Sequence, residues 1–281
     1  MGKPKGQSWE TCDEDVKSYI NYLTEHLRDF LADNLLGVYL HGSLTMASYY
    51  RPKSDIDLFV IIKNPLVIPA KKALNVMIAK HSEKRPTTST FELNVITAEV
   101  AKNPQLPLPF ELHYSIGLQA KILNDEMDYS ANHTDVDLVA QIMYAIRYGI
   151  CLFGQPIATV FGKITWLDFI EAVVADYRKI VHEDDIVKMP INNVLNVCRV
   201  LQLLQQKTTE IHNKDEGAAW GLMHLPMEFV PLIQKVLDTY HSSQAVSLAD
   251  RMTGGIAWDK NALLLFRDYA RSALREHGIA Y

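Results

Sequence analysis

One stretch of the sequence decides the predicted fold: Gly37-Val-Tyr-Leu-His-Gly-Ser-Leu-Thr-Met-Ala-Ser-Tyr-Tyr-Arg-Pro-Lys-Ser-Asp-Ile-Asp-Leu-Phe-Val-Ile-Ile62. The apolar residues 38–40 predict a strand, and the Gly42-Ser43 pair after it allows a sharp turn with amides and a hydroxyl pointing outward. We expect a short helix over residues 44–49, whose N-terminus would favour an anion. The dense apolar run of residues 58–62 predicts a second, buried strand.

Two acidic residues lead into this second strand. Residues two apart on a strand point to the same face, so Asp55 and Asp57 present their carboxylates side by side while Ile56 points into the core. Carboxylates that close repel each other, and a bound divalent cation removes the penalty. Such oxygen ligands suit Mg²⁺, which usually shares its shell with substrate phosphates. The stretch therefore predicts a site for Mg²⁺ and a triphosphate.

The order of strand, Gly-Ser, helix, Asp-x-Asp and strand, with eleven residues between Ser43 and Asp55, resembles the nucleotidyltransferase superfamily built on the polymerase-beta-like core. A lone Asp-x-Asp pair is usually a solvated surface feature, whereas the ordered combination is much rarer by chance. The resemblance implies an α/β N-terminal nucleotidyltransferase domain, a mixed sheet with helices.

Composition limits the function classes. The 281 residues suffice for two domains, and 48% apolar with 22% charged residues are typical of a globular enzyme. A net charge of −5 argues against general nucleic-acid binding and would attract a cationic small substrate. The three cysteines, Cys12, Cys151 and Cys198, have no metal-site or disulfide spacing. No run approaches 18 apolar residues, so we expect a cytoplasmic protein without a membrane partner.

The remaining pattern predicts two domains, residues 1–132 and 133–281. In the first, helices are expected over residues 14–33 and 71–82, a strand over 90–97, and a further strand over 110–115. From residue 135 onward the pattern favours helices only, an all-α C-terminal helical bundle domain. These helices are expected over residues 135–152, 166–181, 192–206, 214–223, 228–240 and 261–277.

The strand over residues 90–97 carries a glutamate in an unusual place. Its alternation puts Glu92 and Asn94 on one face, with Phe91, Leu93 and Val95 on the other. In the superfamily a neighbouring strand carries a third carboxylate, and by position Glu92 is the candidate. The alternative is an edge-strand glutamate that faces water.

Further motifs narrow the resemblance. They are Asn192-Asn-Val-Leu-Asn-Val-Cys-Arg199, the segments 213–220 and 225–240, Leu-Phe-Gly at 152–154, and Phe91-Glu-Leu-Asn-Val-Ile96. Taken together they resemble the aminoglycoside nucleotidyltransferases of the 3''/9 type, the streptomycin and spectinomycin adenylyltransferases. The resemblance covers about residues 16–240.

This resemblance implies an enzyme that binds ATP with two Mg²⁺ ions and transfers AMP to a drug hydroxyl. Asp55, Asp57 and Glu92 would hold the metal, and Glu92 would also be the general base. The nucleotide would be bound by Gly42, Ser43, Ser54, Arg199, Lys214 and Tyr240. The alternative is that the last three are ordinary surface or packing residues of the helices.

The sequence departs from this family in the expected acceptor site. Ser115-Ile-Gly117 stands where streptomycin-modifying members carry a tryptophan, and their acid before the Asn-x-Val-Leu helix falls near Met189-Pro190. An aromatic face and an acid are what a guanidinium-bearing sugar requires, so the departure favours spectinomycin or another acceptor over streptomycin. Asp184 and Asp185, just upstream, are the candidates for replacement acids.

Three function classes stay open at this point. The first is an antibiotic adenylyltransferase with a small aminoglycoside-type acceptor, acting as a monomer or weak dimer. The second is a nucleotidyltransferase for a protein or another hydroxyl acceptor, and the third is a non-catalytic nucleotide-binding module. The near-neutral charge argues against RNA as a partner, and the complete set of three acids argues against a module without catalysis.

Overall fold

The computed structural model describes residues 6–88, 90–206 and 209–279. The chain divides into two compact units, which we call the sheet unit, Gln7–Tyr49 and Ser54–Ala172, and the helical unit, Val173–Tyr281 together with Gly6 and Tyr50–Lys53. This division differs from the predicted boundary between residues 132 and 133. The reason is that residues 137–154 add a helix and a strand to the sheet unit.

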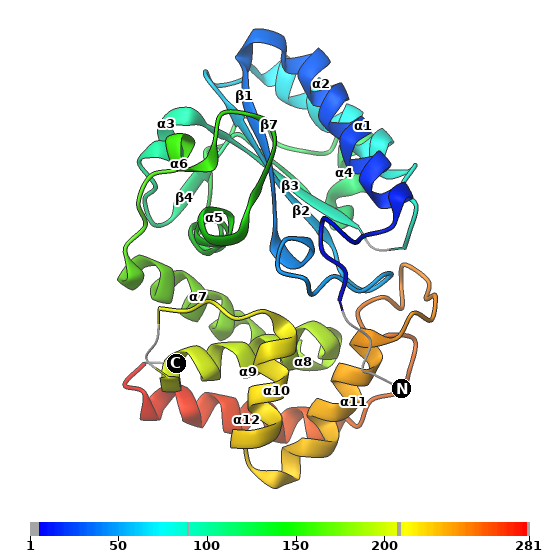
Figure 1. Cartoon of the computed structure of the whole chain (residues 1–281), viewed down its shortest axis with the longest axis vertical. Helices are drawn as coiled ribbons and strands as arrows, with labels where there is room; N and C mark the ends of the chain where they lie inside the picture. Colours follow the sequence, from blue (N-terminus) through cyan, green and yellow to red (C-terminus); the bar gives the residue numbers. More distant parts are fainter. Residues whose placement is uncertain (1–5, 89, 207–208, 280–281) are drawn as a thin grey trace. The chain divides into compact units, whose positions relative to one another are not determined.

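The sheet unit is built on a five-stranded mixed sheet (Figure 1). Its strands, in spatial order, are β5 (Leu112–Tyr114), β3 (Phe91–Thr97), β2 (Ile56–Ile62), β1 (Leu35–His41) and β7 (Ile150–Gly154). Strands β2 and β3 run parallel, and the other three pairs are antiparallel. A separate pair joins β4 (Leu108–Phe110) to β6 (His133–Asp135).

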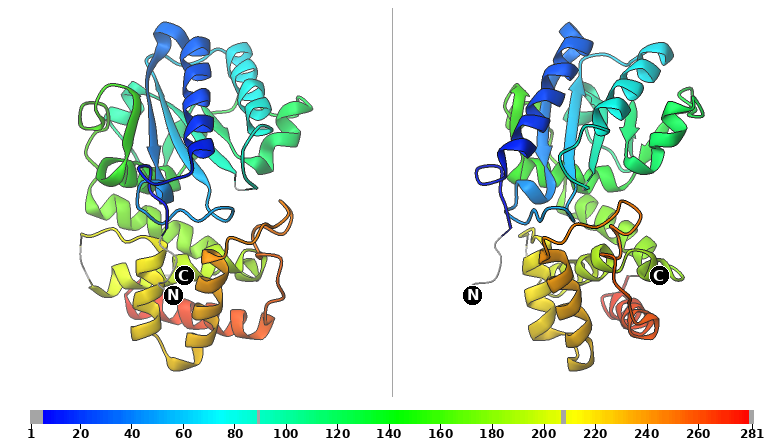
Figure 2. Two further views of the ribbon diagram at one scale, coloured as in Figure 1. Left: turned by 45° about the vertical axis from the view of Figure 1, so that its right-hand side comes forward. Right: turned by 90° about the vertical axis from the view of Figure 1, so that its right-hand side faces the viewer.

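Two long helices, α1 (Glu14–Leu31) and α2 (Ile68–Ser82), cover one face of this sheet. Two turned views show them side by side, in blue and cyan (Figure 2). Helix α1 buries a stripe at helical spacing, which includes Ile20 and Leu23, against sheet residues such as Leu58 and Val60. Because strand residues alternate, this packing leaves Asp57 and Glu92 on the opposite face.

That opposite face is contacted by α5 (Asp137–Tyr148), which packs on β1. The aromatic ring of Phe161, after α6 (Ile157–Val160), lies 5.2 Å from Tyr39 and 5.9 Å from Phe59 between ring centroids. The short helices α3 (Ala98–Lys102) and α4 (Gln119–Leu123) complete the unit.

The helical unit is formed by helices that pack on one another (Figure 1). They are α8 (Asp185–Lys188), α9 (Pro190–Gln206), α10 (Lys214–His224), α11 (Val230–His241) and α12 (Lys260–Glu276), preceded by α7 (Trp166–Ile180), which begins in the sheet unit. Helices α9, α10 and α11 contact each other pairwise. Asn213 and Glu216 form a capping box at the start of α10, and Asp259 caps α12.

The predicted mixed α/β sheet is confirmed, and most predicted elements lie within a few residues of their expected bounds. The helix expected over residues 135–152 is wrong in its second half, because it ends at Tyr148 and residues 150–154 pair with β1 instead. An added Cβ at Gly149 would overlap the carbonyl of Ala145, so this glycine allows the sharp exit. The helix expected over residues 44–49 is also wrong, since a 3₁₀ turn over Gly42–Leu44 takes its place.

Among the residues that the structure describes, no helix has both the length and the apolar character needed to cross a membrane.

His81 of α2 makes the sheet unit sensitive to acid. It is buried, its ring lies 4.5 Å from that of Tyr19, and burial together with nearby His26 lowers its pKa to about 4. The unfolded chain, with a pKa of about 6.5, binds the proton more readily, so stability falls as the pH drops from 7 toward 4.

Replacing His81 by phenylalanine should therefore remove part of this acid sensitivity. Between pH 7 and pH 5 the wild type should lose about 1–2 kcal/mol more unfolding free energy than His81→Phe. Urea unfolding at both pH values measures this difference directly. Equal losses in the two proteins would contradict a buried neutral imidazole.

Candidate active site

Strands β1, β2 and β3 bring the predicted acidic residues to one end of the sheet. Asp57 is the second residue of β2 and Glu92 the second of β3, and the parallel register makes them direct neighbours. Adjacent strands lie about 4.8 Å apart, and residues in register point to the same face. Because β1 runs antiparallel to β2, its end at His41 and Gly42 lies beside Asp57.

The backbone conformation of Gly42 and the atoms around it both exclude a side chain at this position. Its φ is +75°, and a Cβ placed on it would overlap Oδ2 of Asp57. The Asp57 carboxylate thus lies directly against the Gly42 backbone. The glycine predicted to turn the chain also makes room for the acid.

Asp55 links the start of β2 to the start of β3. It precedes β2, and its Oδ1 accepts hydrogen bonds from the Thr90 amide at 3.0 Å and from the Thr90 hydroxyl at 2.6 Å. The Ile56 amide donates to the Thr90 carbonyl at 2.9 Å. Asp55 therefore ties the start of β2 to the start of β3, and so supports the register that pairs Asp57 with Glu92.

The turn between the strands is closed by backbone hydrogen bonds. The Ser48 amide donates to the Ser43 carbonyl at 3.0 Å, and Ser43 Oγ donates to the carbonyl of Asp55 at 3.4 Å. The Ser54 side chain is buried just before Asp55. Both predicted phosphate-contacting serines thus lie at the same end of the sheet as the acids.

The donor chemistry at this end fits a hard divalent cation. Asp57 and Glu92 present carboxylate oxygens on one face, the ligand type that Mg²⁺ prefers. In the described part of the chain, no three His, Cys, Asp or Glu side chains already stand in metal-binding geometry. The predicted set of Asp55, Asp57 and Glu92 therefore stays a prediction, with Asp57 and Glu92 best placed.

His41 adds no positive charge to this acidic end. Its ring is stacked on Phe59 with centroids 4.7 Å apart, and complete burial lowers its pKa to about 3. The imidazole is therefore neutral at pH 7. In the register of β1 and β2 it stands opposite Asp57, so the acids keep their attraction for a cation.

A polar network that sequence reasoning noticed only through Asn94 extends from the Glu92 face. Asn94 is buried, its amide donates to Gln141 Oε1 at 3.1 Å, and its Oδ1 lies 2.7 Å from His113 Nδ1. Gln141 in turn donates to Asp137 at 2.7 Å. This network holds α5 and β5 to the strand that carries Glu92.

The nucleotide-binding candidates of the second half come from three helices that pack together. Arg199 lies on α9, Lys214 begins α10 and Tyr240 lies near the end of α11. Lys214 Nζ donates to Asn192 Oδ1 at 2.6 Å and lies 5.7 Å above the centre of the Tyr240 ring. Asn192 and Arg199 are two helical turns apart, so Arg199 and Lys214 share a face of the helical unit.

Close packing of α9 on α10 fixes this arrangement. A Cβ at Gly217 of α10 would come within 2.8 Å of the Arg199 Cα, so the backbones approach closely there. Arg199 Nη2 also donates to Asn196 Oδ1 at 3.0 Å. The structure thus packs Lys214 against Tyr240 and α10 against Arg199, and the predicted role of the three residues in nucleotide binding stays a prediction.

Sequence reasoning missed a cluster that joins these residues. Tyr50, from the loop between Gly42 and Asp55, donates its hydroxyl proton to Asp215 Oδ1 at 3.2 Å, and its ring lies 4.9 Å from Tyr240. His241 Nε2 contacts the same Asp215 oxygen. Burial and the Asp215 charge raise the pKa of Tyr50 well above its usual value, so its hydroxyl stays protonated. No local sequence pattern indicates that Tyr50, in a loop, contacts these helices.

The two candidate acceptor acids are engaged in ion pairs. Asp184 pairs with Lys260 at 2.9 Å and with Arg267 at 3.3 Å, which ties it to α12. Asp185 pairs with Lys188 within α8. These contacts give both acids a structural role, and their predicted role in acceptor binding stays a prediction.

A mixed sheet with two acids abreast on parallel strands, beside a Gly-Ser turn, is the arrangement expected of a nucleotidyltransferase. Comparison with known proteins agrees with this class. Residues 159–254 match the family model of the aminoglycoside adenylyltransferase C-terminal domain.

Known relatives extend the similarity over most of the chain. A spectinomycin 9-adenylyltransferase of Campylobacter jejuni is 27% identical over 79% of this chain and 84% of its own length. One of Staphylococcus aureus is 26% identical over 74% and 78%. The crystal structure of an Enterococcus faecalis spectinomycin adenyltransferase, solved with ATP and spectinomycin, superposes with a TM-score of 0.78 at 22% identity, covering 92% of this chain and 99% of that one.

These matches confirm the resemblance to the aminoglycoside nucleotidyltransferases that the sequence predicted, and they identify the protein as an enzyme of the nucleotidyltransferase class. The structural match shows that the two proteins share a fold.

The close approach at Gly42 can be tested by adding a methyl group. Gly42→Ala should lower the unfolding free energy by about 1–3 kcal/mol, because the positive φ and the overlap with Asp57 both oppose a side chain. Gly117→Ala is the matched control, since the nearest atom to its new Cβ is Ser115 Oγ at 4.0 Å. Urea unfolding of both variants provides the measurement, and equal stabilities would refute the close approach.

Proposed function

We propose that this protein is a Mg²⁺-dependent adenylyltransferase that transfers AMP from ATP to a hydroxyl of a spectinomycin-type antibiotic, and so confers resistance. The observation that carries the proposal is the pairing of Asp57 with Glu92 on parallel strands against Gly42. Structural glutamates seldom stand beside an aspartate on a neighbouring strand, because like charges in register are destabilising. A metal-dependent site explains the arrangement.

The metal would be held by Asp57 and Glu92, with Asp55 beside them. A bound Mg²⁺ pair would neutralise phosphate charge and orient the α-phosphoryl group. The residues themselves contribute carboxylate oxygens whose position is set by the strand register and by the Asp55–Thr90 hydrogen bonds. Thus no rearrangement of the sheet is needed to present Asp57 and Glu92 together.

In the transfer, Glu92 takes the proton of the acceptor hydroxyl. The hydroxyl oxygen then forms a bond to the α-phosphorus of ATP, the bond from that phosphorus to the bridging oxygen breaks, and pyrophosphate leaves with the electron pair. A glutamate suits this task when it lies within hydrogen-bond reach of the hydroxyl. Glu92 is the second residue of β3, so its carboxylate lies near the start of that strand, beside Asp57.

The helical unit would supply positive charge for the phosphates. Arg199 and Lys214 share one face of that unit, and phosphoryl transfer depends largely on positioning and on neutralising phosphate charge. Tyr240 and Asn192 hold the Lys214 ammonium in place before a ligand binds. The side chain therefore loses less conformational entropy when the nucleotide binds. The Gly-Ser turn at residues 42–43 and Ser54 would contribute amides and hydroxyls.

The acceptor is proposed from two lines of support. Relatives that cover most of the chain are named spectinomycin 9-adenylyltransferases. In addition, Ser115 and Ile116 replace the tryptophan expected for streptomycin, and ion pairs engage Asp184 and Asp185. A net charge of −5 suits a cationic drug of either type.

A pyrophosphate-release assay tests this function. The purified protein is incubated with ATP and Mg²⁺, and with spectinomycin, streptomycin or no acceptor, and the drug product is identified by mass spectrometry. We expect release with spectinomycin, none after EDTA, and little with streptomycin. Absence of turnover with every drug would eliminate the proposal.

Glu92→Gln should separate binding from chemistry. The amide keeps the shape of the side chain but cannot take a proton, so turnover should fall about 10²–10⁴-fold. Binding of Mg-ATP, measured by calorimetry, should change far less. Turnover at the wild-type level would show that another group is the base.

Lys214→Ala should weaken the binding of ATP. Loss of a charged hydrogen bond to phosphate predicts a rise in KM for ATP of roughly tenfold or more. Lys179→Ala, at an exposed lysine of α7 in the same unit, is the matched control and should leave KM unchanged. If Lys214→Ala instead lowers only the melting temperature, the lysine is a packing residue.

A further inference from the structure

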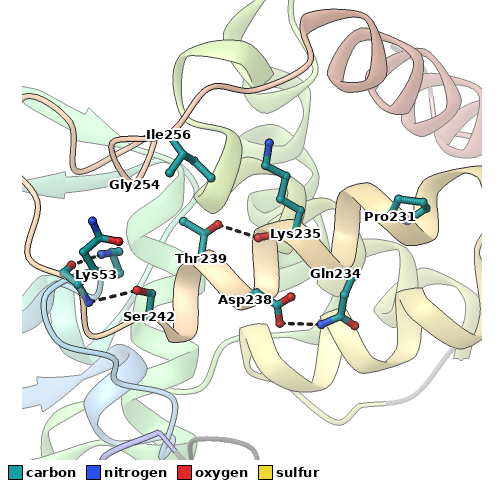
Figure 3. Close-up of a pocket in the computed structure, with 10 residues that line it drawn as sticks. Lys53, Pro231, Gln234, Lys235, Asp238, Thr239, Ser242, Gly254 and Ile256 are labelled. Atoms are coloured by element: carbon teal, nitrogen blue, oxygen red, sulfur yellow. Dashed lines mark hydrogen bonds between the residues drawn. The ribbon is translucent and has the colours of Figure 1, made fainter.

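The helical unit contains a pocket that the proposed reaction does not use. Its volume is about 470 Å³, within the range of small-molecule sites. Figure 3 shows that α11 contributes one wall, including Lys235, Asp238 and Thr239, while Gly254 and Ile256 contribute from the following segment. Lys53 lines the pocket as well.

Lys53 is the unusual member of this pocket. The residue as a whole is only 9% exposed, and burial lowers the pKa of its ammonium group. Its Nζ donates to the carbonyl of Gln244 at 2.7 Å, and in the described part of the chain it forms no ion pair with a carboxylate. A buried charge is costly unless an opposite charge accompanies it, so this lysine favours an anion in the pocket.

The other polar groups of the pocket add a second positive charge and partners for ligand hydroxyls. Lys235 is held by the Ala257 carbonyl at 2.7 Å and by the Trp258 ring at 4.8 Å, and it adds a second positive charge. Asp238 accepts from Gln234 at 2.8 Å and can accept from ligand hydroxyls with its other oxygen. Ser242 Oγ accepts from the Gln244 amide at 3.1 Å, which leaves its proton for a ligand.

We propose that this pocket is a second small-molecule site, which binds a phosphorylated sugar with the phosphate at Lys53 and sugar hydroxyls toward Asp238. Lysine binds phosphate as a point charge, and a carboxylate is a common acceptor for sugar hydroxyls. The volume exceeds that of a lone phosphate and accommodates a sugar attached to it. The site is separate from Arg199 and Lys214, which do not line it.

The test uses the full-length protein and ribose 5-phosphate as probe, with inorganic phosphate and ribose as comparisons. Binding is measured by calorimetry and by the shift in melting temperature. In the wild type, ribose 5-phosphate should bind more tightly than inorganic phosphate, and ribose should not bind. In Lys53→Met, affinity for ribose 5-phosphate should fall at least tenfold, roughly the loss expected for one charged hydrogen bond.

Three further variants test whether the loss of binding is specific to Lys53. Lys179→Met, an exposed lysine of α7, should bind like the wild type, and Lys214→Ala should too, because the nucleotide candidates lie elsewhere. Lys235→Met should weaken binding less than Lys53→Met. Since Lys53→Met removes a desolvated charge, it should fold, and circular dichroism checks this.

Equal affinity in the wild type and folded Lys53→Met would overturn the proposal. So would a loss of binding in Lys214→Ala, which would move the site to the nucleotide candidates. Failure of ribose 5-phosphate to bind the wild type, or binding no tighter than that of inorganic phosphate, would also overturn the assignment of a sugar phosphate.

Discussion

The parallel pairing of β2 with β3 is the constraint on which the site depends. It is the parallel pair of the five-stranded sheet, and its register puts Asp57 beside Glu92. A shift by one residue would turn one acid into the core, where an unpaired carboxylate is strongly disfavoured. The Asp55–Thr90 hydrogen bonds oppose such a shift at the very start of both strands. The geometry of the acids is thus set by the same contacts that build the sheet.

Charge is distributed unequally between the two units. The end of the sheet carries acids and a neutral His41, whereas the paired helices α9 and α10 carry Arg199 and Lys214 on one face. A metal-bound nucleotide needs both kinds of group, acids for the cation and basic residues for the phosphates. The acids and the two basic residues are thus carried by different units of the chain.

Much of this arrangement could be predicted from the sequence, because it depends on local pattern. The Gly-Ser turn, the Asp-x-Asp strand and the face of Glu92 follow from alternation and from residue type. The β7 strand could not be predicted, since residues 150–153 continue the apolar pattern of the preceding helix and only pairing with β1 decides their conformation. Tyr50 was missed for a similar reason. Its partners Asp215 and Tyr240 are more than 160 residues away in sequence, and no local pattern reports such contacts.

The segment Tyr50–Lys53 belongs to the helical unit although the residues on both sides of it belong to the sheet unit. The chain therefore passes between its two units on both sides of this segment, as well as after Gly6 and near residue 172. A cut at residue 172 would leave Tyr50 and Lys53 on a fragment that lacks Asp215 and Gln244. An exchanged helical half would likewise lose its contacts with Tyr50 and Lys53 unless this short segment were exchanged with it. The four residues Tyr50–Lys53 therefore have to match the helical unit, although they are encoded within the sheet unit.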